Sequence, residues 1–145
     1  MIGIIITGHG SFGTGIVSAI ELLTGHQDFL LPIDFKADHS EEQLKDNLKA
    51  AFERFRDCSQ ILVLCDILGG SPFKNAVLLS LGDDRIKVLY GTNLAMAVEL
   101  AMRSMLDQIS DIDALSDELI EIGKAQIGKY KFEPVKTPEE TDEGI

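Results

Sequence analysis

The chain has 145 residues, of which 45% are hydrophobic and 26% charged, and a chain of this size buries roughly 68 to 70% of its unfolded surface. It therefore needs neither disulfides nor a structural metal, and we expect one soluble globular domain. The 13 basic and 24 acidic residues give a formal net charge of -11. Such a charge repels phosphate backbones and anionic lipid, which excludes nucleic acid as an expected partner.

The sequence also indicates where the chain resides. Its first basic residue is Lys36, so the start lacks a basic targeting region, and no apolar run approaches the roughly 20 residues of a membrane span. Cys58 and Cys65 are too few for a disulfide framework or a cysteine-based zinc site. Because Cys65 ends an apolar run, it is expected to be a buried, reduced thiol in a cytoplasmic protein.

The first elements in chain order are a strand, a loop, a helix and a second strand. Residues 2–7 form a β-branched run, and a glycine-rich loop over residues 8–15 follows it. Apolar residues then recur at helical spacing as far as Gly25. Residues 29–35 predict a second strand, and Pro32 within it indicates a sheet edge, because proline cannot donate to a strand ladder.

A second helix and a third strand follow. Ser40 and Gln43 predict a capping box at the start of the helix. Residues 61–65 form a continuous apolar run, which is typical of a strand buried on both faces. After this strand, we expect Ser71 to cap a helix whose first residue is Pro72.

The last elements complete a fourfold alternation of strands and helices. Residues 86–90 predict a fourth strand, Asn93 is a possible cap of the next helix, and residues 111–127 predict a final helix. Alternation of this kind predicts an α/β fold with an open, doubly wound, mainly parallel sheet. With the second strand at an edge, the expected strand order is 2-1-3-4.

This order makes the first and third strands central neighbours, and ligands bind where the carboxyl ends of such strands meet. His9 and Asp66 occupy those two ends. A neutral imidazole is a competent nucleophile when a carboxylate holds the proton on one nitrogen, because the other nitrogen keeps its lone pair. We therefore predict His9 as the reactive group and Asp66 as the residue that orients it.

Two loops are expected to bind a phosphoryl group at this position. Gly10 and Ser11 lead into the first helix, and Gly69, Gly70 and Ser71 lead into the third. Helix N-termini present backbone N–H donors and a positive pole, which favour an anion. Asn93 is a weaker candidate at the same rim. The predicted site contains no metal ligand and requires no cofactor.

The first loop also matches the dinucleotide-binding fingerprint. Gly8, Gly10 and Gly13 have the required spacing, and Asp34 stands at the end of the second strand. However, His9 lies inside the turn where a pyrophosphate needs bare backbone, and 145 residues leave no room for a separate substrate domain. A nicotinamide site is therefore the less favoured interpretation.

Three segments together resemble the IIA component of the mannose family of the bacterial phosphoenolpyruvate-dependent sugar phosphotransferase system. They are Gly8-His9-Gly10, residues 66–75 (Asp-Ile-Leu-Gly-Gly-Ser-Pro-Phe-Lys-Asn) and residues 91–94 (Gly-Thr-Asn-Leu). The resemblance extends to about residue 128. It implies a phosphohistidine carrier in which His9 accepts a phosphoryl group from the phosphocarrier HPr and passes it to a IIB component, with Asp66 as its hydrogen-bond partner.

The resemblance also implies a domain organisation and an assembly. Residues 1–128 would form the IIA domain, and residues 129–145 a C-terminal strand and charged tail. Members of the family are homodimers that exchange this strand, which residues 130–135 would supply here. The protein would associate with the membrane only indirectly, through the transporter complex. The chain departs from the common family pattern at two positions, with Gly8 before the histidine and Ala95 after Asn-Leu.

Three alternatives stay open from the sequence. The phosphoryl-donor subunit of a dihydroxyacetone kinase system shares this domain. A small tetrapyrrole metal chelatase also begins with a strand followed by His-Gly-Ser, as in residues 9–11, but it needs a second metal ligand, usually another histidine, and none follows His39. A signalling module whose phosphorylation is sensed by a transcription regulator would use the same His9.

Overall fold

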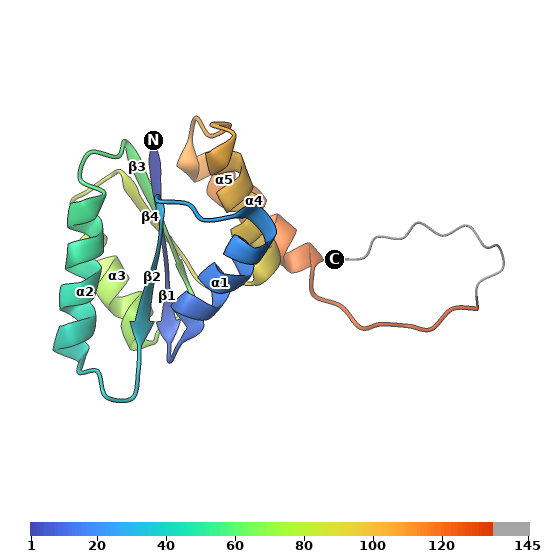
Figure 1. The fold of residues 1–145 in the computed structure, drawn as a ribbon, viewed down its shortest axis with the longest axis horizontal. Helices are drawn as coiled ribbons and strands as arrows, with labels where there is room; N and C mark the ends of the chain where they lie inside the picture. The colour runs from blue at the N-terminus through green and yellow to red at the C-terminus, as the bar shows by residue number, and fades with distance from the viewer. Residues whose placement is uncertain (135–145) are drawn as a thin grey trace.

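The computed structural model describes residues 1–134 and shows four strands and five helices in strict alternation until the last two helices (Figure 1). The elements are β1 (Ile2–His9), α1 (Phe12–Thr24), β2 (Leu30–Phe35), α2 (Glu41–Arg54), β3 (Gln60–Cys65), α3 (Ser71–Ser80), β4 (Ile86–Leu89), α4 (Leu94–Met105) and α5 (Ile112–Ala125). The predicted elements are thus all present up to residue 125.

The strands form one parallel sheet in the order β2-β1-β3-β4, as predicted from the alternation and from Pro32. β1 and β3 are the central pair, and their register places Thr7 beside Cys65. β2 and β4 are the two edges. The carboxyl ends of β1 and β3 therefore lie next to each other, with His9 as the last residue of β1 and Asp66 directly after β3.

Helices cover both faces of the sheet (Figure 1). α2 and α3 pack on one face, and α1, α4 and α5 pack on the other. Alternate side chains of β1 point to opposite faces of the sheet. Ile4 and Ile6 belong to the core under α1, α4 and α5, whereas Ile5 belongs to the core under α2 and α3. Cys65 is fully buried, which confirms the predicted buried thiol, and this burial raises its pKa to about 12.

One of the helix caps predicted from the sequence is present in the structure, and another is wrong. Ser40 forms the predicted capping box with Gln43. The predicted cap at Ser71 is wrong by one residue, because Gly70 is the N-cap and Ser71 is already helical. The first bond of this helix runs from the N–H of Lys74 to the carbonyl of Gly70 at 2.9 Å. Proline is tolerated at the second helical position because it has no N–H, and an N–H at that position would have no partner within the helix.

Residues 127–134 follow α5 without regular secondary structure. The predicted exchanged strand, residues 130–135, includes Val135, which lies outside the described residues together with the charged tail. Exchange needs a second copy of the chain, so the strand stays a prediction. Within residues 1–134, no helix combines the length and the apolarity that crossing a bilayer requires.

Candidate functional site

His9 and Asp66 form the pair that the strand order predicts. The Nδ1 atom of His9 lies 2.8 Å from Oδ2 of Asp66, although 57 residues separate them in sequence. The His9 side chain is 46% exposed and that of Asp66 is 13% exposed. The imidazole is therefore accessible to a partner, whereas the carboxylate that binds it is largely covered.

The Asp66 carboxylate also accepts two backbone hydrogen bonds. The N–H of His9 donates to Oδ2 at 2.8 Å, and the N–H of Ile67 donates to Oδ1 at 2.7 Å. Burial alone would raise the pKa of Asp66, but these two N–H groups and the His9 side chain together lower it below its ordinary value. An ionised carboxylate can only accept, so in the neutral ring of His9 it favours the tautomer with the proton on Nδ1 and the lone pair on Nε2.

The loop after β3 packs against the imidazole. A Cβ atom at Gly70 would lie 2.5 Å from Cε1 and 3.0 Å from Nε2 of His9. Gly69 beside it has a φ of +88°, a conformation that favours glycine. Ser71 is the first residue of α3, directly after the N-cap Gly70, so its hydroxyl lies at the start of that helix.

The loop after β1 is anchored to the end of β2. The N–H of Gly10 donates to the carbonyl of Phe35 at 2.7 Å, and the N–H of Phe35 donates back at 3.1 Å. Gly10 has a φ of +61°, which again favours glycine. Ser11 is the N-cap of α1, yet its side chain makes no capping bond. Both predicted serine hydroxyls therefore lie at helix starts, and that of Ser11 does not cap its helix.

Asp34 caps α1 from a neighbouring strand, a role that sequence reasoning missed. Its Oδ1 accepts the N–H of Thr14 at 2.9 Å, and its Oδ2 accepts the Thr14 hydroxyl at 2.8 Å. The carboxylate thus caps the helix, which accounts for Asp34 without the ribose contact of the dinucleotide interpretation. Its pairing with Gly8 across β1 and β2 brings it next to the start of α1, and no local sequence signal predicts that pairing.

Asn93 serves the packing of two helices. Its Oδ1 accepts the N–H of Met96 at 3.2 Å, which confirms the cap of α4, and its Nδ2 donates to the carbonyl of Gly123 in α5 at 2.9 Å. Both ends of the amide are therefore engaged. Phosphoryl binding by Asn93 stays a prediction, and no contact with His9 or Asp66 supports it.

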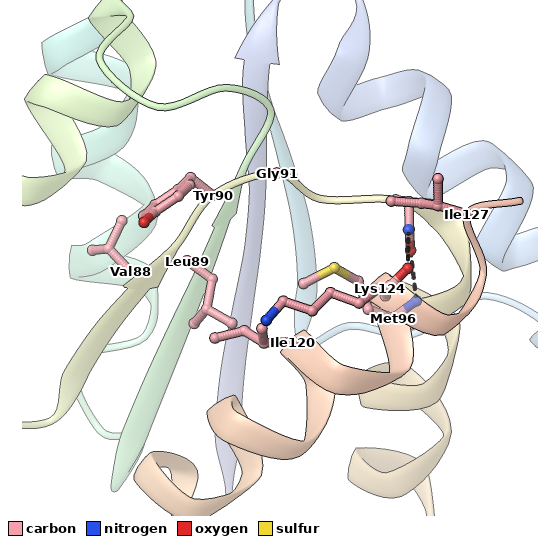
Figure 2. A pocket seen from close by; sticks show the side chains of 10 residues that line it. Val88, Leu89, Tyr90, Gly91, Met96, Ile120, Lys124 and Ile127 are labelled. Carbon is pink, nitrogen blue, oxygen red and sulfur yellow. Dashed lines mark hydrogen bonds between the residues drawn. The ribbon is translucent and has the colours of Figure 1, made fainter.

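A pocket of about 410 Å³ lies along the β4 edge, apart from the His9–Asp66 pair. Figure 2 shows Leu89 and Tyr90 of the β4 segment on one side and residues of α5 on the other, with the Lys124 side chain extending towards Ile120. Apolar side chains dominate this edge, so it is suited to packing against another segment of chain.

The fold and the site together define a class of protein. It is a small α/β domain with an open parallel sheet, in which an exposed imidazole binds a carboxylate where the carboxyl ends of the two central strands meet. A model of the family described as PTS system fructose IIA component matches residues 3–116. PTS denotes the phosphotransferase system. The chain belongs to this family, and it is a phosphotransferase component of a sugar PTS.

Individual relatives agree with this assignment. The chain is 26% identical over 135 residues to the PTS system fructose-specific EIIA component of Bacillus subtilis, covering 90% of this chain and 92% of the relative. It is 29% identical over 135 residues to the PTS system mannose-specific EIIAB component of Escherichia coli K12, covering 93% of this chain but 41% of that longer protein.

Solved structures agree as well. The crystal structure of phosphotransferase system component EIIA from Streptococcus agalactiae is 37% identical, with a TM-score of 0.79 and coverage of 89% of this chain and 97% of that one. The mannose/sorbose specific IIA subunit from Enterococcus faecalis, at 21% identity and a TM-score of 0.80, covers 92% of this chain and 98% of that one and shares the fold. The family match spans both His9 and Asp66, which decides against the chelatase and dinucleotide alternatives.

Proposed function

We propose that the protein carries a phosphoryl group on Nε2 of His9, which it accepts from HPr and passes to a histidine of a IIB component. The observation that carries the proposal is the 2.8 Å contact between Nδ1 of His9 and the Asp66 carboxylate, next to a half-exposed ring. A carboxylate at Nδ1 supports the neutral tautomer with the proton on that nitrogen and the lone pair on Nε2. One nitrogen is thereby held in place, and the other is available for reaction.

The chemistry of the first step is a displacement between two imidazoles. The Nε2 lone pair of His9 attacks the phosphorus carried by HPr, and the bond between phosphorus and the HPr nitrogen breaks with its electron pair left on that nitrogen. Because Nδ1 keeps its proton, the phosphorylated ring of His9 is cationic. The ionised Asp66 stabilises this cation, and transfer to IIB repeats the displacement with His9 as the leaving group.

The starts of α1 and α3 supply donors for the phosphoryl oxygens. The first N–H groups of a helix have no intrahelical partner and form a positive pole. α3 begins at Ser71, directly after Gly70, which contacts the imidazole. We therefore assign phosphoryl binding to the loop of Gly69, Gly70 and Ser71 and to that of Gly10 and Ser11.

The proposal is tested by labelling with phosphoenolpyruvate carrying 32P in the presence of the general PTS enzymes. Wild type should incorporate label, and His9→Ala should incorporate none. His26→Ala is the matched control, because His26 is an exposed histidine on a loop away from Asp66, and it should be labelled as wild type is. Undiminished labelling of His9→Ala would overturn the assignment.

Asp66→Asn tests the mechanism within the same assay. The amide can still accept a hydrogen bond but has no negative charge to stabilise the phosphorylated ring, and it can donate to Nδ1 and stabilise the wrong tautomer. We expect labelling to slow by about 100-fold, the order of magnitude typical of a misoriented reacting group. A rate equal to that of wild type would remove Asp66 from the mechanism.

The proposal includes a homodimer in which residues 130–135 of one copy pair with β4 of the other. β4 is a sheet edge, and the pocket of about 410 Å³ lies along it. Tyr130 and Phe132 are 85% and 79% exposed in the single chain, an arrangement that favours burial against a second copy. A sugar transporter component is preferred over the dihydroxyacetone kinase subunit, because the relatives named above are fructose, mannose and sorbose components.

A further inference from the structure

We propose that Gly8 and Gly70 are positioning residues that hold the His9–Asp66 pair in place, each by leaving room for the functional side chain of the opposite loop. Gly8 precedes His9 but faces Asp66, and Gly70 follows Asp66 but faces His9. The inference rests on the proposed function for its effect on transfer, whereas the contacts themselves are independent of it.

At Gly70, the imidazole occupies the space of the missing side chain. A Cβ atom there would lie 2.5 Å from Cε1 and 3.0 Å from Nε2 of His9, which is closer than carbon atoms in contact can approach. The ring cannot simply turn away, because its Nδ1 is bound to Asp66 at 2.8 Å. A methyl group at this position must therefore either weaken that bond or crowd the nitrogen that reacts.

At Gly8, the carboxylate occupies the corresponding space. A Cβ atom there would lie 2.7 Å from Cγ and 2.8 Å from Oδ2 of Asp66, and 2.7 Å from a ring carbon of Phe12. Three hydrogen bonds hold this carboxylate, from Nδ1 and the backbone N–H of His9 and from the N–H of Ile67. Because Oδ2 accepts both bonds from His9, displacing it weakens the link to the imidazole.

Backbone conformation does not explain these two glycines. Gly70 has a φ of -78° and a ψ of 172°, which any residue adopts, and Gly8 lies in β1 in regular register with Asp34 of β2. Gly10 and Gly69 show the opposite case, since each has a positive φ and open space where a Cβ would lie. Gly8 and Gly70 therefore provide the space that the side chains of Asp66 and His9 occupy.

The test compares Gly8→Ala and Gly70→Ala with Gly15→Ala, a glycine in α1 with open space around its missing side chain. We expect the two site variants to transfer phosphoryl from phosphorylated HPr about 10-fold to 100-fold more slowly. The loss should fall on kcat more than on KM, because the docking surface is unchanged. In 15N NMR spectra, the Nδ1–H signal of His9 should shift or broaden in both variants and stay unchanged in Gly15→Ala.

A double variant separates positioning from a general loss of stability. Gly70→Ala should lower the melting temperature in the wild-type background and have no such effect in His9→Ala, because removing the ring removes the clash. Equal destabilisation in both backgrounds, or wild-type transfer with an unchanged His9 signal, would overturn the inference. Failure of the proposed function gives a different result, since wild type would then not be labelled while the NMR and stability measurements still report on the glycines.

Discussion

Different surroundings distinguish the three histidines at the scale of single residues. His9 binds one carboxylate through Nδ1. His26 lies between two carboxylates, with Nδ1 2.8 Å from Glu21 and Nε2 3.0 Å from Asp28. His39 accepts the N–H of Lys36 at its Nδ1 at 3.0 Å. The chemistry proposed for His9 needs a free Nε2, whereas the same atom of His26 is engaged by Asp28.

The titration of His26 gives a prediction at this scale. Its pKa is raised above 6.5, first by the hydrogen bond with Glu21 and then by that with Asp28. Folding therefore favours the protonated ring, and this contribution to stability is complete below pH 6.5 and is lost as the pH rises through the higher folded pKa. An NMR titration should show a midpoint above 6.5 that falls in Glu21→Gln; an identical midpoint in that variant would contradict the assigned cause.

Much of the site could be predicted from single residues, because the sequence places them at the ends of two predicted strands. His9 and Asp66 each follow a predicted strand, and neighbouring strands bring their ends together. Gly8 and Gly70 could not be assigned in the same way. A side chain at either position would contact a residue of the opposite loop. The need for glycine is therefore recognised only when the three-dimensional positions of both loops are known.

At the scale of elements, helix starts show which caps a sequence can reveal. Ser40 and Gln43 lie three residues apart and form a local capping box, which the sequence predicts directly. The cap of α1 comes instead from Asp34, 20 residues beyond Thr14 and on another strand. Ser71 was misassigned because Gly70 can begin the helix and proline is accepted at either of the first two positions.

The Asp34 cap predicts a loss of stability at this scale. Asp34→Ala removes acceptors for both the N–H and the hydroxyl of Thr14, and we expect the free energy of unfolding to fall by about 1 kcal/mol. Urea denaturation followed by circular dichroism measures this change. Asp38→Ala, at an exposed loop position, is the control and should differ little from wild type; an equal loss in both variants would argue against the cap.

For the whole molecule, the sequence predicted the strand order because two features agreed. The alternation of strands and helices predicted a parallel sheet, and Pro32 placed its strand at an edge. The boundaries were less predictable, since β1 continues to His9 beyond its β-branched run. Pairing with β3 and β2 extends it, and such partners are not visible in the local sequence.

The proposed dimer gives a prediction for the assembled protein. The full chain should elute as a dimer in size-exclusion chromatography with light scattering, and a chain shortened after Gly128 should be a monomer. The physical reason is that shortening removes Tyr130 and Phe132, whose apolar surface is exposed in a single copy. Circular dichroism should show that the shortened chain keeps its helices. A monomeric full chain would contradict the exchanged strand.

The position of the phosphoryl group tests the central claim most directly. The phosphorylated protein, labelled with 15N in its histidines, can be studied by 31P and 15N NMR, which identify the nitrogen bonded to phosphorus. The Asp66 contact at Nδ1 predicts that phosphorus is bonded to Nε2 of His9, with a proton retained on Nδ1. Phosphorus on Nδ1 of His9, or on any other residue, would contradict the account.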